Sequence, residues 1–284
     1  TKGEVREFDM EHYRAGVYAM EQRSDFEKLI RERRVDYCFQ PIVSAHDGHV
    51  VAYEALMRPQ LPTLRSPITV MQLASEMGRL YDIEKLTFFR ACECYEELEA
   101  AGKLDADALI FVNSIASVSL SDEDWASYCE AHSAILPKLV VEITEEEEMN
   151  ERELERKRNV PGATGVFALD DYGSGYSNGN SLLTVAPKYV KVDIAIIRGI
   201  DTDADKQQFL RALINYVHPR GVQVLAEGVE TLSELRKVLE MGVDLLQGYC
   251  LAPPAAEPGA IGEKAAEVIA EVERRKAERE EAGS

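Results

Sequence analysis

Polar residues stand at or near the C-terminal ends of seven successive apolar segments of this sequence. Each is an acid, an amide or a lysine: Glu54, Asn113, Glu142, Asp170 with Asp171, Lys191, Glu227 and Gln247. A buried carboxylate must be paired with a positive charge or must coordinate a metal ion. If these segment ends meet in the fold, the clustered carboxylates indicate divalent cations.

The oxygen-rich character of this set predicts which ions it would take. Apart from Lys191 it offers carboxylates and amide oxygens, with no His or Cys, and this favours Mg²⁺ or Mn²⁺ over Zn²⁺. The adjacent Asp170 and Asp171 suit two ions, since one carboxylate can bridge both while its neighbour binds one. Paired metals about 3.5–4 Å apart are a recurrent device for hydrolysing phosphodiesters. Lys191 would orient or polarise the attacking water, or neutralise developing charge.

Each residue also has an ordinary structural interpretation. A single Asp or Glu after a strand is commonly a helix N-cap or a partner in a loop salt bridge. Asp170 or Asp171 alone could cap the turn that follows, and Lys191 alone could be a surface residue. The ordered set as a whole favours the metal interpretation.

The elements that must position these residues follow from hydrophobic patterning. Candidate strands are residues 37–43, 50–56, 108–113, 139–143, 166–170, 189–192, 223–226 and 245–248, and helix-period segments such as 71–100, 205–217 and 232–241 lie between them. Eight strands with interposed helices predict an α/β barrel, whose C-terminal strand ends converge on one face. Residues 44–49 are too few for a helical crossover, so the first two strands should pair as an antiparallel hairpin. The prediction is a modified TIM (β/α)8 barrel with an antiparallel first strand.

The rest of the chain bounds the class of protein. We expect an N-terminal helical extension over residues 1–35, the barrel over 36–260, and a C-terminal helix or linker over 261–284. The net charge of −19 argues against a nucleic-acid polymer as partner, although bound cations could still present a positive surface to a phosphate. Neither a membrane segment nor a signal peptide is expected. Five cysteines without zinc-type spacing fit a reducing cytoplasm.

The same residues lie in motifs that resemble the EAL-domain family in order and approximate spacing. The motifs are YEALMR at Glu54, FVNSIAS at Asn113, VEITEEE at Glu142, LDDYGSGYSN at Asp170 and Asp171, VKVD at Lys191, AEGVET at Glu227 and LQGY at Gln247. The tripeptide EAL alone is a weak signal, whereas the ordered series over residues 36–254 is specific.

This resemblance implies hydrolysis of cyclic di-GMP to linear pGpG on two Mg²⁺ or Mn²⁺ ions. Glu54, Asn113, Glu142 and Asp170 resemble the ligands of one ion, and Asp170, Asp171 and Glu227 those of the other. Lys191 would contact the nucleophilic water, Glu227 would assist as a base, and with Glu54 these two form the predicted catalytic group. Gln247 resembles a water or metal contact that lines the substrate site, and Gln40 and Arg58 resemble substrate contacts, Arg58 through a phosphate oxygen. Ca²⁺ should inhibit because its coordination is longer and looser.

Further expectations come from the loop over residues 171–178. It resembles a family loop that links metal binding to dimerisation, with Glu145 and Glu230 in the places of its acidic anchors, so a homodimer is expected. Pro59 departs from the family, which often has an aromatic residue there, and this could alter how guanine is held. A sensor or cyclase domain is expected outside the segment from Thr1 to Ser284.

Two other functions compete with an active phosphodiesterase. One is a catalytically silent receptor or interaction module for cyclic di-GMP, which should lack one or more of the ligands, and here none is missing. The other is an unrelated metal-dependent barrel enzyme, such as an enolase-like one, which the ordered motifs disfavour.

Overall fold

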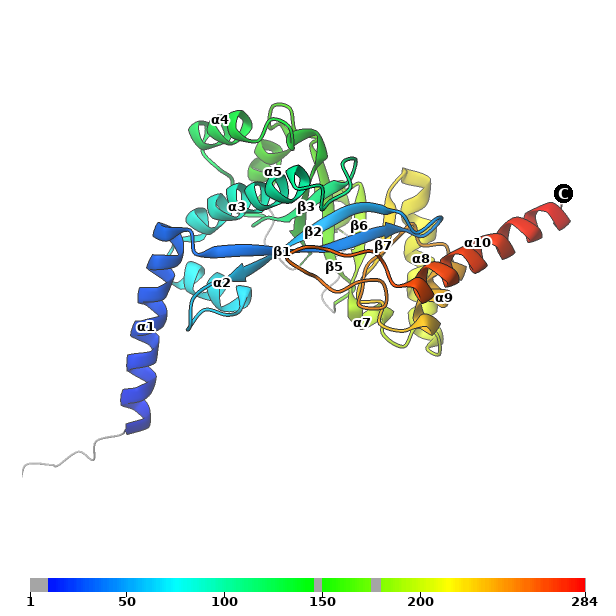
Figure 1. Cartoon of the computed structure of the whole chain (residues 1–284), viewed down its shortest axis with the longest axis horizontal. Helices are drawn as coiled ribbons and strands as arrows, with labels where there is room; N and C mark the ends of the chain where they lie inside the picture. The colour runs from blue at the N-terminus through cyan, green and yellow to red at the C-terminus, as the bar shows by residue number, and fades with distance from the viewer. Residues whose placement is uncertain (1–9, 146–149, 175–179, 284) are drawn as a thin grey trace, which may run out of the picture.

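Eight strands close a barrel in the computed structural model, which describes residues 10–145, 150–174 and 180–283 (Figure 1). The strands follow one another around the barrel in chain order. They are β1 (Val35–Ser44), β2 (Val50–Pro59), β3 (Leu109–Asn113), β4 (Leu139–Thr144), β5 (Val166–Tyr172), β6 (Tyr189–Val192), β7 (Gln223–Ala226) and β8 (Leu245–Leu246). All eight predicted strands are therefore present, and the α/β barrel is confirmed.

The first strand runs against its neighbours, as the short connection predicts. β1 pairs antiparallel with both β2 and β8, and every other neighbouring pair is parallel. Gly48 takes a φ of +74° in the tight turn between β1 and β2, a conformation open to glycine at little cost. In this hairpin Gln40 stands opposite Glu54.

Helices surround most of the barrel. They are α1 (Met10–Glu32), α2 (Pro67–Glu76), α3 (Leu80–Ala100), α4 (Asp122–Ala131), α5 (Glu151–Arg158), α6 (Asn180–Val185), α7 (Ile194–Ile197), α8 (Ala204–Val217), α9 (Leu232–Met241) and α10 (Glu263–Gly283). The single helical segment expected over residues 71–100 is wrong, because α2 and α3 are separate. Gly78 between them has a φ of +64°, which a helix does not accommodate.

The core has two layers. Most buried apolar residues lie between the strands and the surrounding helices. A smaller cluster fills the barrel interior with one side chain from each strand: Ile42, Ala52, Phe111, Val140, Ala168, Tyr189, Leu225 and Leu245. These residues close the barrel below its mouth, so that the interior is a packed core and not a pore.

Two helices extend away from the barrel at opposite ends of the molecule (Figure 1). α1 buries Phe26 and Leu29 near its C-terminal end, and α10 packs against α9 with apolar residues that include Val268 and Ile269. Among the residues that the structure describes, no helix is both long and apolar enough to cross a membrane.

Candidate metal centre at the mouth of the barrel

A polar ring lies one step above the inner apolar layer. Side chains alternate along a strand with a period of two, so the residue two positions from each inner-layer residue also faces the interior. That residue, in or directly after each of the eight strands, is polar or charged: Gln40, Glu54, Asn113, Glu142, Asp170, Lys191, Glu227 and Gln247. The structure thus brings together the predicted ligands, Lys191, Gln247 and Gln40.

Lys191 is the centre of this ring. Its side chain is 1% exposed, and its Nζ lies 2.6 Å from Glu142 Oε1, 2.8 Å from Glu227 Oε1 and 2.9 Å from Asp170 Oδ1. A fourth carboxylate oxygen, Oε1 of Glu54, is 3.5 Å away. Lys191 is therefore an interior cation in contact with four acidic side chains, and its interpretation as a surface residue is excluded.

Amide side chains complete the contacts of Glu54. Gln247 Nε2 donates to Glu54 Oε2 at 2.6 Å and to Gln40 Oε1 at 3.2 Å, and Gln40 Nε2 donates to the backbone oxygen of Ala252 at 3.1 Å. Asn113 Nδ2 lies 3.1 Å from Glu142 Oε2 and 3.5 Å from Glu54 Oε1. This network fixes the Glu54 carboxylate from both sides.

A local distortion of β5 brings two consecutive aspartates to the mouth. In a regular strand Asp170 and Asp171 would point to opposite faces. The pairing of β5 with β6 is irregular between Leu169 and Tyr172, and Asp171 has a φ of +55°. Such an irregularity re-aims a side chain. Both aspartates consequently present an oxygen to the same cluster as Glu227.

The charges of this site do not balance. Five carboxyl groups, of Glu54, Glu142, Asp170, Asp171 and Glu227, surround the single ammonium of Lys191. Burial raises the pKa of Glu142 and of Glu227 well above the usual range, because Lys191 only partly offsets it.

Asp171 and Lys191 respond to the same imbalance. Burial and the neighbouring Asp170 raise the pKa of Asp171 to about 6. Burial acts to lower the pKa of Lys191, but the surrounding carboxylates outweigh it and hold that pKa well above its ordinary value. Without added cations, Glu142, Asp171 and Glu227 therefore hold their protons more tightly than free carboxyl groups do.

The donor set fits two hard divalent cations. Ligand oxygens of Glu54, Glu142 and Asp170 lie within 4.8 Å of one another, and so do those of Asp170, Asp171 and Glu227. Asp170 belongs to both groups, as a bridging ligand must. Among the described residues, Oε1 of Gln247 is a buried oxygen that accepts no hydrogen bond, and Glu142 Oε1 has the Lys191 ammonium 2.6 Å away. All-oxygen donors of this kind suit Mg²⁺ or Mn²⁺.

Two cavities flank the ring. One of about 340 Å³ is lined by Gln40, Glu54, Asp171, Glu227 and Gln247, among others. The second, of about 270 Å³, includes Arg58 and Asn113, and Leu56 lines both. Arg58 Nη1 donates to the backbone oxygen of Met57 at 2.9 Å.

Sequence reasoning did not single out Asp193 and Tyr249, which line the first cavity. A signal for Asp193 was present, because it follows Lys191 by two positions at the end of β6. Tyr249 is 67% exposed beside Gly248, and its signal in the sequence was its place in the LQGY motif, two residues after Gln247.

The predicted loop anchors differ in their surroundings. Glu145 accepts hydrogen bonds from the Gly173 amide at 3.4 Å and from Ser181 Oγ at 3.3 Å, on either side of the loop. Glu230 forms an ion pair with Arg198 and lines the first cavity. Residues 175–178 of the loop lie outside the described residues, so the anchoring role of both glutamates stays a prediction.

These features define a (β/α)8-type barrel with a carboxylate-rich centre at the C-terminal ends of its parallel strands. More particularly, the chain belongs to the EAL domain family, whose model matches residues 23–254. Cyclic di-GMP phosphodiesterase NbdA of Pseudomonas aeruginosa is 29% identical over 245 residues, which cover 83% of this chain and 31% of NbdA. Probable cyclic di-GMP phosphodiesterase PdeG of Escherichia coli is 26% identical over 223 residues, 76% of this chain and 44% of PdeG. The chain thus spans less than half the length of these curated relatives.

Solved structures agree on the fold. BlrP1 of Klebsiella pneumoniae, in a complex with manganese and cyclic di-GMP, superimposes with a TM-score of 0.67 at 26% identity, covering 80% of this chain and 58% of that one. The PaMucR phosphodiesterase in complex with c-di-GMP gives a TM-score of 0.69 at 24% identity, covering 83% and 97%. The second likeness concerns the fold alone.

Proposed function

We propose that this chain is a divalent-cation-dependent phosphodiesterase that hydrolyses cyclic di-GMP to linear pGpG. The observation that carries the proposal is the pair of carboxylate groups that share Asp170 and surround Lys191. The named phosphodiesterase relatives support the choice of substrate. The complex of BlrP1 with manganese and cyclic di-GMP supports both the ion and the ligand.

The residues divide the work as follows. Glu54, Asn113, Glu142 and Asp170 would hold one Mg²⁺ or Mn²⁺, and Asp170, Asp171 and Glu227 the other. When bound, these ions activate water and stabilise charge on the phosphate. Lys191 keeps the carboxylates in place and presents a proton donor where charge develops. Glu227, whose Oε1 lies 2.8 Å from Lys191 Nζ, would assist as the base that accepts a proton from the attacking water.

The cavities support an extended, two-lobed substrate. Cyclic di-GMP carries two guanosines joined by two phosphates, and two cavities that share Leu56 lie beside the carboxylates. Arg58, in the second cavity, would hold a phosphate oxygen, and Gln40 and Gln247 would contact the substrate from the first cavity. Pro59 follows Arg58 directly at the end of β2, where it is buried.

Turnover separates this proposal from the receptor alternative. Purified protein with Mg²⁺ or Mn²⁺ should convert cyclic di-GMP to pGpG in a chromatographic assay, and a chelator should stop the conversion. Glu54→Ala removes a ligand and should abolish turnover, whereas Glu76→Ala, at an exposed position on α2, should not change it. Binding of cyclic di-GMP without product under both ions would establish the receptor function instead.

Several expectations remain predictions. They are the homodimer, a sensor or cyclase domain outside this segment, the cytoplasmic location, and the boundaries of the catalytic unit at residues 36 and 260. The family match from residue 23 includes the last turns of α1 in addition to the barrel.

A further inference from the structure

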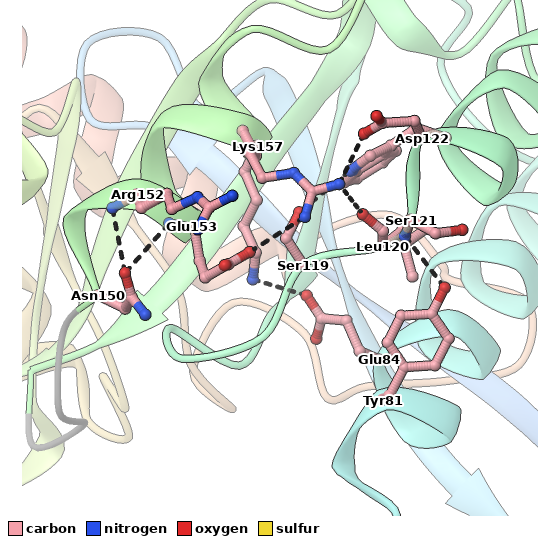
Figure 2. Close-up of polar contacts among 12 residues, drawn as sticks. Tyr81, Glu84, Ser119, Leu120, Ser121, Asp122, Asn150, Arg152, Glu153 and Lys157 are labelled. Carbon is pink, nitrogen blue, oxygen red and sulfur yellow. Dashed lines mark hydrogen bonds and ion pairs between the residues drawn. The ribbon is translucent and has the colours of Figure 1, made fainter.

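A second buried ion pair lies just outside the polar ring. Lys157 of α5 and Glu84 of α3 have side chains 0% and 1% exposed, and Lys157 Nζ donates to Glu84 Oε1 at 2.7 Å (Figure 2). Lys157 Nζ also donates to Ser114 Oγ at 2.5 Å and to the Ile115 backbone oxygen at 2.6 Å. An ammonium has three protons to donate, and here each has an acceptor.

Glu84 is satisfied in the same way. Ser114 Oγ donates to its Oε1 at 2.6 Å, and the Ile115 amide donates to its Oε2 at 2.9 Å. Ser114 and Ile115 are the two residues that directly follow Asn113 at the end of β3. The ion pair therefore holds the backbone in place directly after Asn113, a proposed metal ligand, where the chain leaves the barrel.

The pair also joins three consecutive parts of the barrel wall. α3 lies between β2 and β3, and α5 lies between β4 and β5. These helices come from the segments that follow Glu54 and Glu142, and they meet on the loop that follows Asn113. The Asn113 side chain in turn lies between the carboxylates of Glu54 and Glu142.

Burying two opposite charges is seldom the most stable way to fill a core, since apolar residues of similar volume commonly serve as well or better. A fully satisfied polar network does restrict geometry, because each hydrogen bond demands a direction. Asn113 would be the neutral member of its ligand set, and its carbonyl gains less from an ion than a carboxylate does. Its contribution therefore depends most on being held in place.

We propose that Glu84 and Lys157 form a positioning pair that fixes Asn113 and thereby tunes the affinity of the site for its divalent cation. This proposal rests on the proposed metal-dependent function for its ligand. Neither residue forms a hydrogen bond or an ion pair with the ring carboxylates, and Glu84 also lines the second cavity together with Asn113. The predicted effect of the pair is on cation binding and on the backbone at residues 114 and 115.

The test compares two variants with a control from the same helix. Glu84→Gln/Lys157→Met makes the pair neutral and leaves no orphaned charge, and Glu84→Asp keeps the charge but withdraws the carboxylate by one methylene. Arg156→Met is the control, because Arg156 ties α5 to the same β3–α4 loop farther along, at the Leu120 backbone oxygen (3.0 Å) and Asp122 (2.7 Å). Figure 2 shows Leu120 and Asp122 together with the buried pair.

Two readouts do not depend on turnover. In calorimetric titration with Mn²⁺, the dissociation constant should be at least tenfold higher for both pair variants. It should change by less than twofold for Arg156→Met. Hydrogen exchange of the Ser114 and Ile115 amides should be at least tenfold faster in the pair variants without added metal. Excess Mn²⁺ should restore most of kcat, since the defect is in affinity.

Folded pair variants with Mn²⁺ affinity within twofold of wild type would overturn the proposal. Loss of cooperative unfolding in both variants would overturn it as well, because the pair would then serve the fold and not the site. If the wild-type protein binds Mn²⁺ but does not hydrolyse cyclic di-GMP, the proposed function is refuted. The comparison of Mn²⁺ affinities between the variants still tests the positioning pair.

Discussion

Replacing Lys191 by methionine should show separately what the ammonium contributes to stability and what it contributes to turnover. Methionine keeps most of the volume of the side chain but removes the ammonium that lies 2.6–2.9 Å from Glu142, Glu227 and Asp170. Removing one partner from a buried ion pair costs about 3–5 kcal/mol. Because burial already raises the pKa of Glu142 and Glu227, both can hold protons, and we expect the lower end of this range.

For a chain of this size a loss of about 3 kcal/mol lowers the melting temperature by roughly 6–12 °C. The assay is thermal unfolding at pH 8 in a chelator, repeated in Mn²⁺. A cation present at 100 times its Kd stabilises the folded state by about 2.7 kcal/mol, so Mn²⁺ should recover most of the loss. Turnover should stay at least about 100-fold below wild type, because the lost proton donor acts where charge develops.

Lys188→Met is the matched control, three residues earlier in the chain. Lys188 is exposed and donates to the backbone oxygen of Gly221 at 2.9 Å. Its replacement should change stability by about 0.5 kcal/mol or less. A Lys191→Met variant that melts with wild type in chelator, or one that turns over cyclic di-GMP at a near-normal rate, would refute this account of the ring.

Three further predictions concern single features of the site. The pKa of Asp171 is raised to about 6 in the folded metal-free protein, so protonation of Asp171 stabilises the folded state. This stabilisation is complete below pH about 4 and is lost as pH rises through 6. Asp171→Asn is the reference, because asparagine tolerates the same positive φ. The unfolding free energy of wild type minus that of Asp171→Asn should fall by at most about 3 kcal/mol from pH 4 to above pH 6. A difference that does not change with pH would contradict the raised pKa of Asp171. Gly248→Ala places a Cβ 2.3 Å from the backbone of Val229 and should cost about 3 kcal/mol in denaturant titrations, whereas Gly78→Ala, with nothing within 4 Å, should cost about 1 kcal/mol from its positive φ alone. Ca²⁺ as the sole divalent ion should bind but not support hydrolysis, and undiminished product formation with it would contradict the coordination argument.

The barrel and most of the ring could be predicted from the sequence, because short apolar runs alternate with helical segments and most ring residues end such a run. Glu142, Asp170 and Lys191 each end such a run, and the structure places them in one interior layer. The Glu84–Lys157 pair could not be predicted. Lys157 lies within the charged stretch ERELERKR, which is typical of a solvated helix, and only the tertiary fold buries it.

Gln40 shows where the strand-end argument fails and why. The rule that functional residues follow the C-terminal end of a strand would select Ser44 on β1, but Ser44 pairs with Leu245 at the start of β8, below the mouth. Because β1 is reversed, the position facing the ring precedes the inner-layer residue Ile42 by two instead of following it. That position is Gln40, which only the family resemblance identified.

The reversed strand has a consequence for the charge of the ring. β1 and β8 meet at the closure of the barrel and contribute amides, Gln40 and Gln247, where β4, β5 and β7 contribute carboxylates. Amides can hydrogen-bond to one another, to Glu54 and to the Ala252 backbone without adding charge. Glu54 on β2 and Glu227 directly after β7 flank this closure, so carboxylates and amides line the first cavity together. The carboxylates of this cavity repel a substrate phosphate unless cations are bound, so cation binding should precede productive substrate binding.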